Sequence, residues 1–306
     1  MFENLFAHRG LSLDRLRSFL EVAEAGSIVG AVDGDPVRQS QYSRQIGELE
    51  SFFGVELVRR AGKRLQLTPR GKQLAAAARA QLQGLSDFQQ ACQNAPLNFH
   101  IGAGDSLLQW LIIPQMSRFQ ELFPRTKLFL YNHRSRDIAE RLVDLRLDFG
   151  VARASIIGAP LSQYSLGSVT YGLFVPKKIQ KGVAQWSDER LLQELPWVTL
   201  GSDGELMEKL VRACLQKKIQ INFSLITESF PQAARAVHSG CYAAILPLHA
   251  ENDFDPSEIV VKNSPFLKTC ARKVVLAWNP KMLTFRPGAD SAREFLQKYL
   301  RLKTNR

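Results

Sequence analysis

Apolar residues in the first third of the chain recur with the period of short amphipathic helices. Between positions 13 and 24 they return every three or four residues, with charged residues between them, which predicts a helix. A short second helix is predicted over 28–32, after the Gly26-Ser27 stop and cap. Asp35 then caps a third helix that begins at Pro36 and closes at Gly54. Three short helices in succession indicate a small helical domain.

The third helix has an uneven apolar face. Its predicted inward stripe is dense only from Tyr42 onward, and consists of Val37, Tyr42, Ile46, Leu49 and Phe53. The outward positions carry polar side chains, namely Arg38, Gln39, Gln41, Ser43 and Gln45. A helix that packs through its second half and projects hydrogen-bond donors from its first half is suited to entering a groove.

Two strands and a long helix are predicted after Gly54. The strands flank Ala61-Gly62-Lys63 and form a wing with a basic tip, and Thr68-Pro69 provides the cap and first residue of the long helix. Its apolar stripe is narrow and consists of Leu74, Ala78, Leu82, Leu85 and Phe88. We therefore expect a helix of a second subunit to cover it.

Strands and helices alternate after Pro96. A strand at 97–104, a helix at 106–123 interrupted by Pro114, a strand at 127–132, a helix at 135–146 and a strand at 148–152 predict a parallel sheet. A second α/β run reaches position 247, and the chain returns with a strand at 272–278 and a helix near 289–301. Two such units leave a cleft, where small ligands bind.

The net charge of the chain says more about its partners than its length does. The 306 residues are enough for two or three domains, and the formal net charge of +11 favours an anionic partner. The stretch from Leu57 to Ser86 contains no acidic residue, although seven basic residues lie in it. A solvated basic face is the alternative interpretation of this stretch.

No motif for catalysis, metal binding or export stands out. The sequence has no HExxH, GxSxG, P-loop or GxGxxG pattern, so we expect no enzymatic activity and no cofactor. The four cysteines lack CxxC spacing, which indicates reduced, mostly buried thiols, with a redox sensor as the alternative if two of them meet. Without a signal peptide or a long apolar run, we expect a cytoplasmic protein with no membrane contact.

The N-terminal pattern resembles that of LysR-type transcriptional regulators. The family's motif is met, without a gap as far as Arg60, by Leu16, Phe19, Val22, Ala23, Glu24, Gly26, Ser27, Ala31, Val37, Gln39, Ser43, Arg44, Gln45, Ile46, Leu49, Glu50, Gly54, Leu57, Arg60, Leu67, Thr68 and Gly71. The stretches IGAGDSLLQWLIIP and VHSGCYAAILP extend the resemblance over the rest of the chain. The chain departs from the family at positions 34–36 and 38–41, so the target site of a relative does not transfer.

The resemblance implies an N-terminal all-α winged helix-turn-helix, a long linker helix, and a C-terminal two-lobed α/β effector domain like periplasmic binding proteins. We expect the DNA-binding domain at 1–68, the linker and dimerisation helix at 69–94, and the effector domain at 95–306. Within the effector domain, lobe I is expected at 95–167 plus 264–306 and lobe II at 168–263.

The implied function is sequence-specific control of transcription by a small-molecule effector. The expected partners are double-stranded DNA, the effector, and a second or further copies of the chain in a homodimer or homotetramer, with RNA polymerase as a candidate. The alternative is a solute-binding module or small-molecule sensor that does not read an operator.

The expected site residues follow from these roles. For the base edges we expect Arg38, Gln39 and Gln41, and for phosphates Ser27, Ser43, Arg44, Lys63 and Arg64. For the effector the resemblance implies Ser106, His133, Arg153, Thr199, Ser202, Thr227 and Ser229. Ser106 lies at a helix N-terminus, which favours an anion, and the alternative is that it is only a helix cap.

Overall fold

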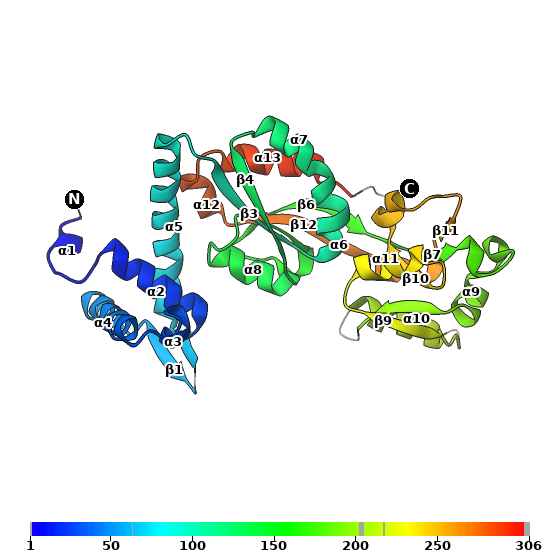
Figure 1. Ribbon diagram of the computed structural model, residues 1–306, viewed down its shortest axis with the longest axis horizontal. Coiled ribbons are helices and arrows are strands. Elements are labelled where there is room, and N and C mark those ends of the chain that lie inside the picture. Colours follow the sequence, from blue (N-terminus) through cyan, green and yellow to red (C-terminus); the bar gives the residue numbers. More distant parts are fainter. Residues whose placement is uncertain (1, 63, 202–204, 217, 303–306) are drawn as a thin grey trace.

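The computed structural model describes residues 2–62, 64–201, 205–216 and 218–302. The molecule is elongated, with the N-terminal domain at one end and the second lobe at the other (Figure 1). The long helix α5 (Pro69–Cys92) stands between the N-terminal domain and the first lobe. The winged helical domain and the two-lobed α/β domain predicted from the sequence are both present.

The N-terminal domain consists of short helices closed by a two-stranded wing. Its elements are α1 (Glu3–Phe6), α2 (Leu13–Ala25), α3 (Ile28–Ala31), α4 (Pro36–Phe53), β1 (Val58–Ala61) and β2 (Arg64–Leu67). Side chains of Ser12, Ser27 and Asp35 accept hydrogen bonds from backbone N–H groups at the starts of α2, α3 and α4, as capping chemistry predicts. The strands of the wing pair antiparallel.

The buried stripe of α4 is shorter than the sequence predicts. Tyr42, Ile46 and Leu49 are buried, but Val37 is 78% exposed and Phe53 is 36% exposed. The predictions that Val37 and Phe53 face the core were wrong, because these positions precede and follow the part of α4 that is buried. The residues of α4 before Tyr42 therefore contribute almost nothing to the core.

The start of α5 is locked to the wing. Thr68 caps the helix by accepting from the Gly71 N–H, and its hydroxyl donates to the Glu56 carbonyl at 2.7 Å. A Cβ on Gly71 would lie 2.0 Å from the Leu57 carbonyl oxygen, so only glycine allows this approach. The far half of α5 is different, since Leu85 is 52% and Phe88 is 68% exposed.

Lobe I is built on a five-stranded sheet in the order β4-β3-β5-β12-β6. The strands are β3 (Leu97–Ala103), β4 (Thr126–Asn132), β5 (Phe149–Arg153), β6 (Ser162–Val169) and β12 (Arg272–Trp278). As predicted, β4, β3 and β5 are parallel, whereas β12 runs antiparallel to β5 and β6. The helices are α8 (Ser135–Val143), α12 (Pro280–Phe285) and α13 (Ala289–Tyr299).

The helix expected over 106–123 is divided into several pieces. A turn of α6 (Asp105–Leu107) leads into a π-helical turn (Leu108–Ile112) and a 3-10 turn (Ile113–Gln115), and only then into α7 (Met116–Leu122). Pro114 lacks the N–H that a continuous helix needs, so regular α-helix is delayed until after it.

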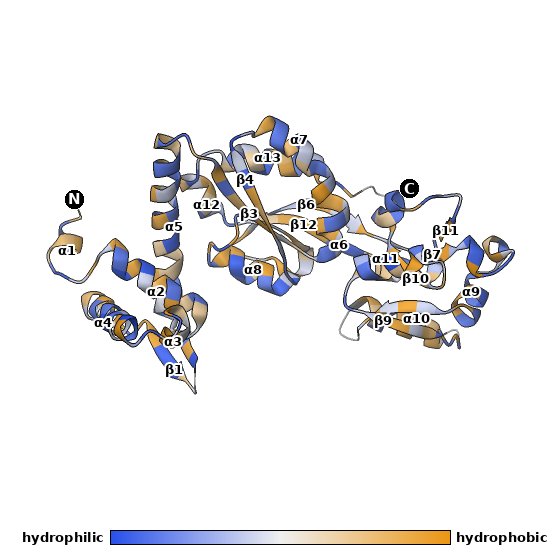
Figure 2. Cartoon of the chain, in the orientation of Figure 1, coloured by the Kyte–Doolittle hydropathy of each residue, from blue (hydrophilic) through white to orange (hydrophobic). Residues whose placement is uncertain are grey.

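Lobe II holds the second sheet, in the order β11-β7-β10-β8-β9. Its strands are β7 (Tyr171–Pro176), β8 (Trp197–Leu200), β9 (Phe223–Thr227), β10 (Ala243–Pro247) and β11 (Ile259–Lys262). Its helices are α9 (Asp188–Glu194), α10 (Glu205–Gln216) and α11 (Phe230–His238). In Figure 2 the central strands carry mostly hydrophobic residues, while hydrophilic and hydrophobic residues alternate along α5.

A buried ionic cluster joins α5 to lobe I. The Arg286 guanidinium donates to Asp87 of α5, with Nε–Oδ2 at 2.8 Å, and also to Asp148 and to the Asn98 carbonyl. The side chains of Arg286 and Asp87 are 2% and 0% exposed. Burial lowers the pKa of Arg286, but the two carboxylates outweigh that effect and raise it. The three side chains therefore form one buried contact, and removal of any one of them leaves another without its partner.

We predict that Asp87→Ala lowers the free energy of unfolding by about 3–5 kcal/mol, because it leaves Arg286 buried with half of its compensation removed. Urea unfolding followed by tryptophan fluorescence measures this change. The control is Arg190→Ala, which breaks a pair with Glu194 in which both side chains are 52% exposed and should cost about 0–1 kcal/mol. Equal small losses in the two variants would contradict the role given to the cluster.

Candidate functional site

The leading half of α4 forms an exposed polar surface. Asp35 accepts from the Val37 N–H at 2.9 Å, which fixes the first turn, and the side chains that follow point away from the core. Among the predicted DNA contacts on this helix, Arg38, Gln41, Ser43 and Arg44 are exposed and Gln39 is half-buried. The helix start is thus well ordered by capping but free of packing neighbours on this side.

Arg38 is held by Tyr42 one turn further along α4. Its Nη2 donates to the Tyr42 hydroxyl at 3.3 Å, and its guanidinium lies 5.6 Å from the centre of the ring. The Tyr42 hydroxyl in turn donates to Glu21 of α2. The hydrogen bond with Tyr42 raises the pKa of Arg38. This chain of contacts orients Arg38 and connects the exposed face of α4 to α2.

Three of the other predicted DNA contacts, Gln39, Arg44 and Ser27, have partners within the domain. Gln39 Nε2 donates to the Gly34 carbonyl at 2.9 Å, and Arg44 Nε lies 3.4 Å from Glu48. Ser27 accepts from the Gly30 N–H, and the neighbouring Gly26 carbonyl accepts from Leu65 of the wing at 2.8 Å. That last contact places Ser27 near Arg64, which is exposed. Lys63 lies outside the described residues.

The expected effector residues of lobe I gather at the carboxyl ends of its strands. Ser106 is the second residue of α6 and is 7% exposed, whereas Gly104 is the residue that caps this helix. The alternative that Ser106 is only a helix cap was therefore wrong. Arg153 ends β5, and its backbone N–H donates to Ser135 Oγ at 3.2 Å.

Three expected residues of lobe II lie together on the facing side. The Thr227 hydroxyl donates to the Thr199 carbonyl at 3.2 Å, and Ser229 caps α11 by accepting from the Gln232 N–H. Helix α11 contacts α6, so this group faces Ser106 across the junction of the lobes. Thr199 also lines a small cavity of about 40 Å³ in lobe II. Ser202 lies outside the described residues.

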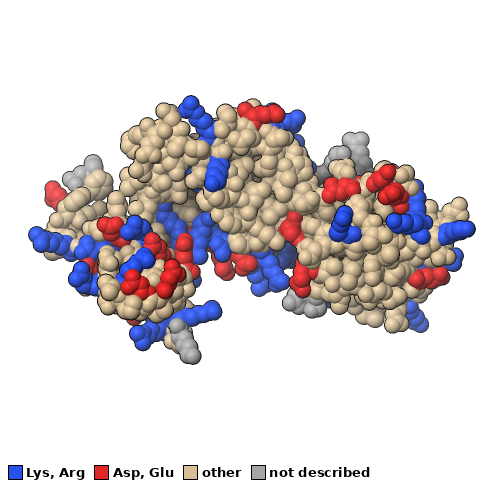
Figure 3. Space-filling model, viewed as in Figure 1, with Lys and Arg blue, Asp and Glu red and all other residues tan. Residues whose placement is uncertain are grey.

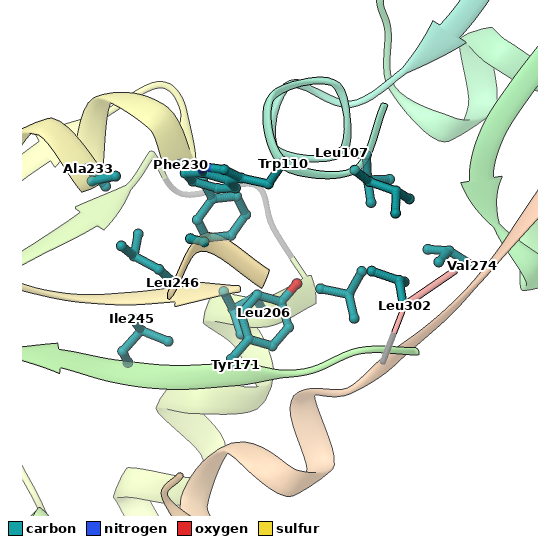
Figure 4. Packing of buried hydrophobic residues seen from close by; sticks show 14 of the residues in the cluster. Leu107, Trp110, Tyr171, Leu206, Phe230, Ala233, Ile245, Leu246, Val274 and Leu302 are labelled. Atoms are coloured by element: carbon teal, nitrogen blue, oxygen red, sulfur yellow. The ribbon is translucent and has the colours of Figure 1, made fainter. Parts of the chain in front are cut away.

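Aromatic side chains of both lobes pack into the space between them. Trp110 of lobe I, together with Phe230 and Tyr171 of lobe II, belongs to one continuous core (Figure 4). The Trp110 indole donates to Asp253 at 2.5 Å, and His249 lies edge-on to it at 5.9 Å. An effector at Ser106 would therefore have to share or displace these contacts.

The His133 side chain is separated from that group, although its backbone lies at the same strand ends, where its N–H donates to the Ala103 carbonyl at 3.0 Å. It lines a second, larger cavity of about 490 Å³ between α5 and lobe I, beside His100 and Tyr131. Its ring is parallel to that of Tyr131 at 5.9 Å, and burial followed by the charge of Arg141 lowers the pKa of His133. The structure thus divides the predicted effector residues between two places.

Family models match nearly the whole chain. Residues 13–72 match the bacterial regulatory helix-turn-helix protein of the lysR family, and residues 97–301 match the LysR substrate binding domain. The chain belongs to the LysR family of transcriptional regulators. It is therefore a DNA-binding regulator with an effector-binding domain, and the matched segments coincide with the winged domain and the two lobes.

Individual LysR-type relatives are distant in sequence but similar in architecture. The uncharacterized HTH-type transcriptional regulator YeiE of Escherichia coli K12 is 23% identical over 239 residues, which is 68% of this chain and 82% of YeiE. A variant of full-length OxyR from Pseudomonas aeruginosa matches with a TM-score of 0.66, 20% identity and 97% coverage of both chains. Full-length CbnR in complex with its target DNA matches with a TM-score of 0.53 and 16% identity, covering 91% of this chain and all of CbnR.

Other expectations for this LysR-family chain concern thiols, metals and membranes. Cys214 and Cys270 are buried, but Cys92 and Cys241 are exposed, so only half of the cysteines are buried as expected. Across the described residues, no His, Cys, Asp and Glu groups are placed to hold a metal ion. None of the helices in the described part of the chain has the length and apolar character needed to cross a membrane.

The residues that sequence reasoning missed are those that connect distant segments. Trp110 and Asp253 are 143 positions apart, and no local pattern pairs them. The cavity beside α5 also escaped prediction. Gln83 and Asp87, which are hydrogen-bonded at 2.8 Å, are four residues apart on α5. This spacing is also usual for polar pairs on the exposed face of a helix, so the sequence did not distinguish Asp87 from other acidic residues.

We predict that acid destabilises this protein partly through His249. Burial lowers the pKa of His249 from 6.5 to about 4, so the unfolded chain binds this proton more tightly. Stability is therefore lost as the pH falls through this window. His249→Gln removes this titration. The wild type's free energy of unfolding minus that of the variant should therefore be lower at about pH 5 than at about pH 7.5, by on the order of 2 kcal/mol.

Thermal or urea unfolding of both proteins at the two pH values measures the difference. The control is His8→Gln, at an exposed position. Its difference in free energy of unfolding from the wild type should be the same at both pH values. If the difference between wild type and His249→Gln were also the same at both pH values, the claim that the folded protein keeps the His249 imidazole neutral beside Trp110 would be contradicted.

Proposed function

We propose that this regulator reads its operator with the first half of α4 in the major groove. The observation that carries the proposal is that this half is capped by Asp35, exposed, and rich in side chains that fork to base edges. Arg38 and Gln41 are placed for guanine and adenine, with Gln39 at the margin of the same face. Ser27, Ser43, Arg44, Arg64 and Lys63 are assigned to phosphates, which fix the register.

Residues suited to phosphate contact lie on both sides of α4 and support this docking. The hydrogen bond between Leu65 and Gly26 holds the wing beside the start of α3, so that Ser27 and Arg64 flank the recognition helix. The stretch from Leu57 to Ser86, which contains basic residues and no acidic ones, continues this surface onto α5. A basic strip of this kind provides the salt-dependent part of the affinity.

The functional unit that we propose is a homodimer or homotetramer paired through α5. Leu85 and Phe88 are exposed on the far half of this helix, and a partner helix would bury them. Two copies of α4 would then meet half-sites about one helical turn, or a multiple of it, apart. Within the cytoplasm, where the DNA is, RNA polymerase is a natural further partner of such an assembly.

For the effector we propose a small molecule, with an anion favoured, at the junction of the lobes. Ser106 of lobe I and Thr199, Thr227 and Ser229 of lobe II offer hydroxyl and backbone donors on facing sides, with Arg153 nearby. Ser202 is assigned to the same site from the sequence alone. Because Trp110, Phe230 and Tyr171 fill the same junction, binding there changes how the lobes pack. The protein acts through this binding and not through catalysis.

The assignment of Arg38 is tested with defined duplexes. Arg38→Ala should weaken binding to the specific operator by about tenfold to a hundredfold and relax one base position, because a bidentate contact is lost. Arg64→Ala should weaken specific and random duplexes alike and reduce the salt slope by about one. Fluorescence anisotropy over a range of salt concentrations measures both.

Arg190→Ala, which lies in lobe II, is the control and should change neither affinity. If Arg38→Ala weakened specific and random duplexes equally, Arg38 would be a phosphate contact and the reading assignment would be overturned.

Pairing through α5 is tested by Phe88→Lys. A charge placed at the centre of the predicted helix pair should shift the protein to monomers in sedimentation velocity and lower operator affinity by at least about tenfold, because one of the two half-site contacts is lost. Phe6→Lys changes an 85% exposed phenylalanine outside α5 and should leave the oligomer intact. An unchanged sedimentation coefficient for Phe88→Lys would place the interface elsewhere.

A further inference from the structure

The larger cavity lies where the DNA-binding domain, the linker helix and lobe I meet. It has a volume of about 490 Å³, within the range of small-molecule sites. Glu24 of α2 and Arg79 of α5 contribute one wall, and the residues of lobe I contribute the rest. It lies apart from the junction of the lobes, since Ser106, Thr199 and Thr227 are not among its lining residues.

Unneutralised positive charge lines this cavity. Arg141 and Arg146 both face it, and within the described residues neither side chain has a hydrogen bond or an ion pair. The Arg146 Nε and the His133 Nε2 are buried without a partner in the same part of the structure. Figure 3 shows Lys and Arg side chains gathered in the recess between the N-terminal domain and the first lobe.

Two of the acidic residues nearby are already engaged. Glu24 pairs with Arg79 at 3.4 Å, and Asp148 belongs to the cluster with Arg286. The Asp144 backbone carbonyl accepts from Arg79 at 3.0 Å, and the charge of Asp144 also acts on Arg79. Burial and then the charge of Arg146 lower the pKa of Arg79, and the charge of Arg141 acts in the same direction on the pKa of His133. Like charges are thus held close together around a hollow, an arrangement that an anion stabilises.

The backbone is arranged to hold Arg146 there. Leu145 has a left-handed φ of 56°, which costs free energy for a residue other than glycine, and the Arg146 N–H donates to the Arg141 carbonyl at 2.7 Å. This turn at the end of α8 directs both arginines to the same cavity. The lining also includes the apolar side chains of Leu147, Met282 and Phe285.

We propose that this cavity binds a small organic anion, whose carboxylate or phosphate group lies between Arg141 and Arg146 and whose compact apolar body packs on Met282 and Phe285. The planar guanidinium of an arginine can donate two parallel hydrogen bonds to either a carboxylate or a phosphate. His133 and Tyr131 of the same wall can supply further hydrogen bonds. Because Arg79 comes from α5 and Arg146 from lobe I, a bound anion connects the linker helix to the effector domain. The site would sense a second signal, independent of the junction between the lobes.

The test uses calorimetric titration of the full-length protein with phenyl phosphate and with benzoate, which share a ring and differ in the anionic group. Benzyl alcohol is the neutral counterpart. We expect at least one of the two anions to bind and benzyl alcohol not to bind. Which anion binds more tightly distinguishes a phosphate ligand from a carboxylate ligand. Failure of both anions to bind would overturn the proposal.

Variants locate the binding site. Arg146→Gln and Arg141→Gln should each raise the dissociation constant by about tenfold or more, the size expected for a lost charged hydrogen bond. Arg146→Lys, which keeps the charge but loses the fork, should have an intermediate affinity. The controls are Arg136→Gln, an exposed residue on the same helix, and Thr199→Val at the junction of the lobes, and both should bind as the wild type does.

Retained affinity in both glutamine variants, or loss of affinity in Thr199→Val, would place the anion elsewhere and overturn the proposal. Circular dichroism of each variant separates loss of binding from loss of folding, and the two arginines provide independent variants if one of them fails to fold.

Discussion

The buried contact of Arg286 with Asp87 and Asp148 determines how the two halves of this regulator are connected. Buried charges are tolerated only when paired, so the end of α5 is fixed to lobe I wherever this contact persists. The start of α5 is fixed to the wing by Thr68 and by the close approach of Gly71 to Leu57. Because α5 is held at both ends, a change in the position of lobe I would be passed through this helix to the DNA-binding domain. The cavity lined by Arg146 lies against this same helix, where an anion would act on the connection directly.

The junction of the lobes is the second place where the structure can change. Trp110, Phe230 and Tyr171 join the two lobes through one apolar core, with the indole of Trp110 hydrogen-bonded to Asp253. A polar effector bound between Ser106 and Thr199, as we propose, would compete with that packing, so its binding free energy would be coupled to the arrangement of the lobes. Lobe I lies between α5 and lobe II (Figure 1), and the chain enters and leaves lobe II beside β6 and β12 of lobe I. The effector signal and the proposed anion signal would therefore converge on lobe I.

Features that depend on local sequence were predictable. The caps at Ser27, Asp35 and Thr68 and the delay of the helix after Pro114 follow from single residues and their neighbours. Strands β6 and β11 were missed, because β6 contains polar and glycine residues throughout and β11 is only four residues long. Val37 fits the helical period but lies before the packed part of α4, which periodicity alone does not show. The Asp87–Arg286 contact joins residues 199 positions apart, and in the sequence Asp87 is an ordinary acidic residue on a polar helix.

The central claim is that a paired set of α4 helices reads a specific operator. Selection of bound duplexes from a random pool by the full-length protein tests it most directly. The account predicts enrichment of two related half-sites in inverted orientation, separated by about one helical turn or a multiple of it. Binding with strong salt dependence but without enrichment of any sequence would contradict it, because that result would mean that the protein contacts only the phosphates.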